Sequence, residues 1–209
     1  MVQVLQSRNV TLRDLIDRFG IQLSQDENFF SEWRTDLPEI SDADKQFLDK
    51  VKNGYFNLVE YPPFLEKTVQ IAILSPLLLL ADFFLPPFHV KAEKSTEIIT
   101  EDEGTIIRGQ LDFVVLKDNF WLMVIESKEM SYSLEVGLAQ LLSYMLASPN
   151  PEQPGYGMLT NGGSFTFVKL VREDVPKYQT SRFFELRNPG NELYDVLRVL
   201  KRIGQLEIH

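Results

Sequence analysis

The sequence contains no cysteine, and this absence excludes several kinds of chemistry. Without thiols, the chain can form no disulfide, no zinc–thiolate site, no iron–sulfur cluster and no thiol nucleophile. A chain without cysteine fits the reducing conditions of the cytosol, so we expect a cytoplasmic protein.

Histidine is almost as scarce, because the chain contains only His89 and His209. Neither gives a basis for histidine-dependent nuclease chemistry or for a Ser-His-Asp hydrolase. The sequence also lacks the G-x-x-x-x-G-K-[ST] motif of a nucleotide-driven motor and the G-x-G-x-x-G motif of dinucleotide binding. If this chain cuts nucleic acid, we expect it to act alone or with a motor on another protein.

No apolar run is suited to crossing a membrane. The most apolar stretch, VQIAILSPLLLLADFFLPPF, is interrupted by Pro76 and Asp82 and ends in two prolines. This pattern predicts a buried helix, so we expect no membrane partner. The start of the sequence also lacks the basic region and sustained apolar region of a signal peptide.

Basic residues are outnumbered, with 21 Lys and Arg against 30 Asp and Glu and a net charge of −9. This balance argues against a broad basic surface that binds nucleic acid non-specifically. Contact with DNA would therefore need a local basic face or a homodimer that forms a shared cleft. The candidates for such a face are Lys91, Lys94, Arg108, Lys117, Lys128 and Lys169.

The composition is otherwise that of an ordinary globular protein, with 44% hydrophobic and 24% charged residues. A chain of 209 residues predicts one domain with one substantial core. Helical spacing predicts a short helix over 11–19 and a second helix that begins at Ser41 and ends near Gly54 or a little later. We therefore expect residues 1–61 to form an N-terminal helical extension.

A third helix is expected over 64–84, kinked or split by Pro76. The chain then changes to short runs of β-branched and aromatic residues, which predict three sequential antiparallel strands. The expected later elements are strands over 88–100, 105–117 and 120–128, a helix over 133–148, a hairpin over 156–171 and a final helix over 192–204. The layout is mixed α/β (α+β), with a core over 62–171 and a C-terminal segment over 172–209.

Three charged residues, Asp112, Glu126 and Lys128, lie in a stretch from Gly109 to Glu129 that is mostly apolar. Glu126 and Lys128 are two residues apart, so they share one face at about 7 Å. A pair of this kind at a strand end can be a solvated pair of little energetic weight. Asp112 is different, because an isolated carboxylate inside the neighbouring strand is costly unless it is paired, hydrogen-bonded or bound to a metal.

The register between these strands decides whether the two carboxylates meet. A two-residue turn at 118–119 would place Asp112 opposite Ile125 and away from Glu126, because opposed residues share a face. A three-residue connection at 118–120, or a bulge, would place Asp112 opposite Glu126. A catalytic site therefore predicts the longer loop or a bulge.

Two carboxylates that meet in this way would repel unless a hard cation lies between them. Mg²⁺ fits, since it takes oxygen ligands and is usually held by one or two carboxylates plus a phosphate. Mn²⁺ is a possible substitute. Such a site would activate a water for phosphodiester hydrolysis, with Lys128 orienting that water or stabilising the developing charge.

The arrangement of Asp112 followed by Glu126-Ser127-Lys128 resembles the D…ExK core of the PD-(D/E)xK nuclease superfamily, although Leu111 stands where the family name implies proline. The stretch LEKTVQIAILSPLLLLADFF resembles the first core helix of type I restriction R-subunit nuclease domains. GLAQLLSYMLA resembles their QxxxY motif, and LTNGGSFTFVKL resembles the hairpin that follows it. The whole chain is similar to small cyanobacterial proteins labelled as R-subunit-like restriction endonucleases.

The resemblance implies a restriction-endonuclease-like core of order αβββαβ that hydrolyses DNA. It implies that Asp112, Glu126 and the carbonyl of Ser127 bind metal and that Lys128 is catalytic. Glu66 would approach the site and add a metal ligand. Two residues would line the site or contact DNA, namely Gln140 and Tyr144. A separate motor or methyltransferase subunit would be a natural partner.

Each of these residues also has a plainer interpretation. Glu66 can be an anion favoured at a helix start, and Gln140 with Tyr144 can share a helix face by i, i+4 spacing alone. The leading hypothesis is a Mg²⁺-dependent DNA nuclease. The alternatives are a catalytically inactive module that binds DNA or protein on the same fold, and a structural protein whose strand-end charges are incidental.

Overall fold

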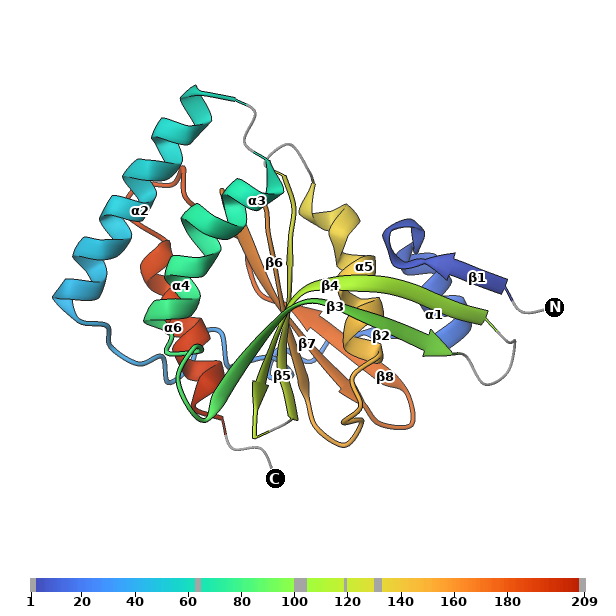
Figure 1. Cartoon of the computed structure of the whole chain (residues 1–209). Helices are drawn as coiled ribbons and strands as arrows, with labels where there is room; N and C mark the ends of the chain where they lie inside the picture. The colour runs from blue at the N-terminus through green and yellow to red at the C-terminus, as the bar shows by residue number, and fades with distance from the viewer. Residues whose placement is uncertain (1–2, 63–64, 100–104, 119, 130–132, 207–209) are drawn as a thin grey trace.

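The computed structural model describes residues 3–62, 65–99, 105–118, 120–129 and 133–206 (Figure 1). The fold is mixed α/β, with a mixed sheet of nine strands among these residues and helices on both of its faces. No helix in the described ranges is long and apolar enough to cross a membrane.

The described residues form both helices and strands, which occur in separate groups along most of the chain. The helices are α1 (Leu12–Phe19), α2 (Asp42–Glu60), α3 (Glu66–Val69), α4 (Ser75–Leu80), α5 (Leu134–Leu146) and α6 (Leu193–Gly204), with a 3₁₀ turn η1 (Ser7–Asn9) and a π-helical turn η2 (Gln70–Leu74). The strands are β1 (Gln3–Gln6), β2 (Gln22–Leu23), β3 (Phe88–Ile99), β4 (Thr105–Lys117), β5 (Phe120–Ser127), β6 (Gly155–Thr160), β7 (Ser164–Arg172), β8 (Pro176–Thr180) and β9 (Phe184–Glu185).

The sheet separates two apolar layers. Figure 1 shows α2, α4 and α6 on one face and α5 on the other. Ile125 of β5 belongs to the first layer, with Leu74 and Leu197 from the helices. Val124 belongs to the second layer, where α1 and α5 contribute Leu15 and other apolar side chains. Because β5 is apolar on both faces, it lies at the centre of the molecule, as its sequence predicts.

The long strand β4 has two different edges. The antiparallel strand β3 pairs with it over Ile106–Lys117. On its other edge, β1 pairs in parallel with residues 105–108 and β5 pairs with residues 113–117. Among the described residues, no strand pairs with 109–112 on this second edge. The backbone groups of that short segment need other partners, and Asp112 lies within it.

The predicted N-terminal helical extension is wrong in part. Both expected helices form, and both begin with a complete capping box, at Thr11 and at Ser41. However, β1 and β2 join the sheet beside β4 and β8, so this segment is part of the sheet. The second helix also continues past Gly54 to Glu60, because Tyr55 is buried against the first apolar layer.

The third helix passes through Pro76 by changing its hydrogen-bond spacing. Proline lacks an N–H, and its ring clashes with the carbonyl four residues before it. The π-helical turn η2 precedes it, and both the N–H and the hydroxyl of Ser75 donate to the carbonyl of Gln70. The helical path therefore continues from α3 through η2 to α4, and it ends at Leu80, short of the expected residue 84.

The predicted core elements follow in the expected order along the chain. The helical path over 66–80 precedes β3, β4 and β5, and α5 and β6 come next. The hairpin at Asn161 and Gly162 joins β6 to β7, with Gly162 in the left-handed region at φ 85°. The sequence did not predict β8 or β9, whereas the final helix α6 is confirmed.

Candidate active site

The connection between β4 and β5 is tight. Lys117 pairs with Phe120, so only two residues link the strands. Asp118, the first of them, has a φ of 48°, in the left-handed region that aspartate tolerates better than most residues. Without any irregularity, this turn would set Asp112 opposite Ile125 and away from Glu126.

A β-bulge restores the register that brings the carboxylates together. The register shifts in the middle of the hairpin, where β5 carries the extra residue Leu122. Beyond the bulge, Phe113 pairs with Ile125, which makes Asp112 and Glu126 the next residues of the two strands. The bulge is therefore present as the catalytic hypothesis requires.

Asp112 is fixed by the end of β5. Its Oδ2 atom accepts a hydrogen bond from the main-chain N–H of Ser127 at 2.7 Å and another from the hydroxyl of Ser127, also at 2.7 Å. Asp112 lies in the part of β4 that lacks a strand partner on this edge, so its side chain takes the place of a ladder bond for Ser127.

Glu126 is a buried carboxylate with one oxygen unused. Its side chain is 2% exposed, and Oε1 accepts a bond of 2.6 Å from the ammonium of Lys128. Oε2 is buried and has no hydrogen-bond partner among the described residues. Burial, and then the negative charge of Asp112, raise the pKa of Glu126 to about 8, although Lys128 acts in the opposite direction.

Lys128 lies between two oxygen acceptors. Its Nζ donates to Oε1 of Glu126 and, at 2.8 Å, to Oε1 of Gln140 on α5. The amide of Gln140 donates in turn to the hydroxyl of Tyr144 at 2.9 Å. The hydroxyl of Tyr144 donates to the carbonyl of Gln110 at 3.0 Å, within the segment of β4 that lacks a strand partner on this edge. The structure thus connects the two predicted α5 residues to Lys128.

Glu66 approaches from the other face through a residue that was not predicted. The amide of Gln70, which is buried, donates to the hydroxyl of Ser127 at 2.8 Å and to Oε1 of Glu66 at 3.3 Å. Burial, followed by the charge of Asp112, raises the pKa of Glu66. A single amide four residues after Glu66, at the start of a mainly apolar stretch, was the signal that could have identified Gln70.

The carboxylates do not form a complete cage for a metal. Within the described ranges, no group of three or more Asp, Glu, His or Cys side chains could hold a metal ion. Glu66 therefore does not join Asp112 and Glu126 in a three-carboxylate cluster. The donor set still fits a hard divalent cation such as Mg²⁺, which needs only one or two carboxylates and keeps waters or phosphate oxygens as other ligands. The unpartnered Oε2 of Glu126 supports this fit.

Two of the six residues predicted for a basic face contact other parts of the fold, and the side chain of Lys94 lies outside the described residues. Lys117 donates to the carbonyls of Gly204 and Leu206, and Lys169 forms an ion pair of 2.6 Å with Glu32. Both ammonium groups therefore serve other parts of the fold. Lys128 is the one predicted basic residue that the contacts above place with the carboxylates.

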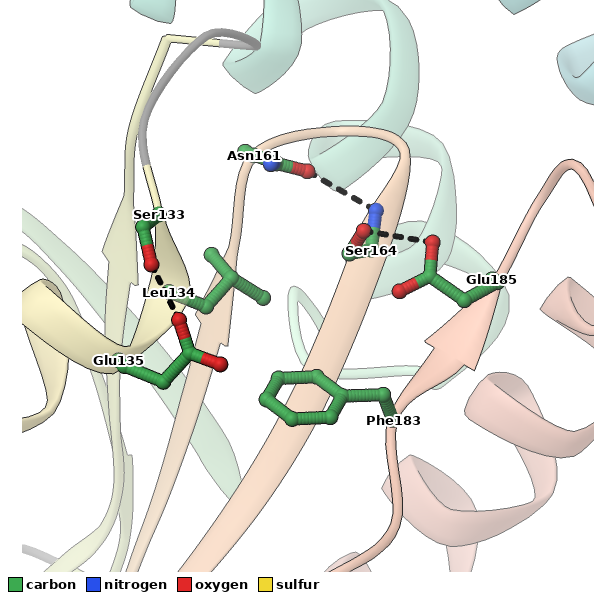
Figure 2. Close-up of a pocket in the computed structure, with 7 residues that line it drawn as sticks. All are labelled: Ser133, Leu134, Glu135, Asn161, Ser164, Phe183 and Glu185. Atoms are coloured by element: carbon green, nitrogen blue, oxygen red, sulfur yellow. Dashed lines mark hydrogen bonds between the residues drawn. The ribbon is translucent and has the colours of Figure 1, made fainter.

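A hollow of about 220 Å³ lies between the start of α5, the β6–β7 hairpin and β9 (Figure 2). It lies beside the tip of the β6–β7 hairpin, and the N–H of Lys128 donates to the carbonyl of Thr160 just before that tip at 2.8 Å. Figure 2 shows the ring of Phe183 along one side and Ser164 bonded to Glu185 on another. The described residues that line it are Ser133, Leu134, Glu135, Asn161, Ser164, Phe183 and Glu185.

Comparison of the sequence with protein-family models gives no match, and comparison with curated proteins gives none either. The chain is therefore assigned to no family, and its likeness to PD-(D/E)xK nucleases stays a prediction from the sequence.

Proposed function

We propose that this chain is a Mg²⁺-dependent DNA endonuclease, with Mn²⁺ as a possible substitute, and that Asp112, Glu126 and Lys128 form its catalytic centre. One observation carries this proposal. Glu126 is a buried carboxylate that holds one oxygen without a partner, next to a second carboxylate and an ammonium group. A purely structural ion pair has no need for the second carboxylate, whose charge makes ionisation of Glu126 harder.

Each residue has a distinct part in the proposed reaction. Asp112 and Glu126 would hold the cation, with the carbonyl of Ser127 as a further ligand. The bound cation would lower the pKa of a coordinated water and neutralise charge on the scissile phosphate. Lys128, which Glu126 and Gln140 keep oriented, would donate hydrogen bonds to the charge that develops on the phosphate.

The core is proposed to be restriction-endonuclease-like. The element order along the chain supports this, since a helical segment, three antiparallel strands, a helix and a parallel strand follow one another. The position of the carboxylates at the end of the central strands supports it too. DNA is the proposed substrate, and a homodimer or a separate motor or methyltransferase subunit are the proposed partners.

A second candidate is a module on the same fold that binds DNA or protein without cutting. Two observations favour it. The net charge is −9, and two of the lysines expected to form a basic face are engaged elsewhere in the fold. In that case the carboxylates and Lys128 would form an ion cluster without catalytic turnover.

A cleavage assay with Asp112→Asn separates the two candidates. Purified protein is incubated with plasmid, linear and single-stranded DNA in Mg²⁺ or Mn²⁺, and in EDTA. We expect the wild type to cut at least one substrate only with the cation. Asp112→Asn should lower the rate about 100-fold or more, because the variant loses one anionic ligand.

Asp118→Asn is the matched control, since it makes the same chemical change in the turn of the same hairpin. Asparagine also tolerates the left-handed backbone of this position. Absence of cutting by the wild type on every substrate, or equal cutting by wild type and Asp112→Asn, would overturn the enzymatic proposal.

A further inference from the structure

The N-terminal segment reaches the candidate active site. Strand β1 pairs with residues 105–108 of β4, and the chain then turns into η1 at Ser7. Ser7 is buried, and its Oγ atom lies 2.8 Å from the hydroxyl of Tyr144. This contact joins residues 137 positions apart in the sequence.

Only one assignment of donors and acceptors satisfies all the hydrogen bonds of the Tyr144 hydroxyl. A phenol has one proton, and that of Tyr144 is directed to the carbonyl of Gln110. Ser7 and the amide of Gln140 must therefore both donate to the phenol oxygen. With its amide nitrogen turned to Tyr144, Gln140 presents its carbonyl oxygen to Lys128.

The backbone of β4 allows this contact because residue 109 is glycine. A Cβ atom on Gly109 would lie 2.1 Å from Oγ of Ser7 and 2.6 Å from Cε1 of Tyr144. Both distances are far shorter than a van der Waals contact. Gly109 is also the first residue of the segment that lacks a strand partner on this edge, so Ser7 and Tyr144 fill that gap.

We propose that Ser7 is a positioning residue of the active site. Its hydroxyl fixes Tyr144, Tyr144 fixes the amide of Gln140, and Gln140 orients the ammonium of Lys128. The segment expected to be an N-terminal helical extension thereby completes the site from the far end of the chain. This inference rests on the proposed function.

The test is a double-mutant cycle with Ser7→Ala and Tyr144→Phe. Each variant should lower kcat for DNA cleavage about 10- to 100-fold, with KM for DNA unchanged. Because Ser7 acts through Tyr144, the double variant should lose no more than Tyr144→Phe alone. Additive losses in kcat, or full activity of Ser7→Ala, would overturn the inference while leaving the proposed function intact.

Ser181→Ala is the matched control. Its hydroxyl is also buried and hydrogen-bonded, to the N–H of Phe167 at 2.9 Å and the carbonyl of Arg182 at 2.7 Å. The control should therefore carry a similar stability loss and leave kcat unchanged.

A second readout does not depend on cleavage. In nuclear magnetic resonance spectra, the side-chain amide signal of Gln140, assigned with Gln140→Glu, should shift in Ser7→Ala and stay in place in Ser181→Ala. In the double variant it should coincide with the signal in Tyr144→Phe. An unmoved Gln140 signal in Ser7→Ala would overturn the inference even if the wild type cuts no DNA.

Discussion

Replacing Lys128 with methionine is expected to reduce DNA cleavage about 100- to 1000-fold, the loss typical for removal of one donor that stabilises developing charge. Methionine keeps most of the length of the side chain and removes the ammonium. The two acceptors of Lys128, on Glu126 and Gln140, then lose their donor. The measurement is the initial rate of cleavage at pH 7 in saturating Mg²⁺.

The same variant should keep its fold at pH 7. Lys128 lowers the pKa of Glu126, so its removal raises that pKa above its value of about 8. Glu126 therefore stays protonated at pH 7, and no unpaired buried charge remains. Lys91→Met, at an exposed position of β3, is the control. Cleavage by Lys128→Met within a few-fold of the wild type would mean that Lys128 only pairs with Glu126.

Replacing Glu126 with glutamine is expected to change how stability depends on pH. In the cation-free protein the pKa of Glu126 is about 8, well above the ordinary value of 4.5. Between these two values, the folded chain holds a proton that the unfolded chain has lost. The free energy of unfolding therefore falls as pH rises, and Glu126 accounts for about 1.4 kcal/mol of this fall per pH unit. The contribution of Glu126 to stability is fully present only below the pKa that this group has in the unfolded chain.

Glutamine does not ionise, so Glu126→Gln should lose this dependence. Near pH 5 the two proteins should have similar free energies of unfolding, and near pH 8 the variant should be more stable by several kcal/mol. Urea unfolding in EDTA between pH 5 and 8 measures this difference. Glu173→Gln, at an exposed position, should follow the wild type. If the free energies of unfolding of the wild type and Glu126→Gln changed with pH in the same way, this would contradict the buried position of this carboxylate.

The sequence predicted the central strands well because they are short runs of β-branched and aromatic residues separated by turn-forming clusters. It could not decide the register, since β5 is apolar on both faces and a slip by one residue exposes neither face to water. One bulged residue, Leu122, shifts the register so that Asp112 and Glu126 become neighbours. From the sequence, a site at Asp112 and Glu126 required either a three-residue connection at 118–120 or a bulge.

The parts of the site that the sequence missed depend on contacts between distant segments. Strand β1 has four residues, too few for a clear alternating pattern. The role of Ser7 follows only from its hydrogen bond with Tyr144, which the sequence does not show. Gln70 is identified by its contact with Ser127, which lies 57 residues away. Likewise, the lysines expected on one basic face include Lys117, whose partners lie at the end of α6.

The claim that Asp112 and Glu126 hold a divalent cation is tested most directly by calorimetric titration of Mg²⁺ in buffers of different ionisation enthalpy. Near pH 7, Glu126 is mostly protonated, because its pKa is about 8. It must ionise to bind the cation, so the wild type should release about one proton for each Mg²⁺ bound. Glu126→Gln should release none. Absence of Mg²⁺ binding by the wild type, or the same proton release from Glu126→Gln, would contradict the claim.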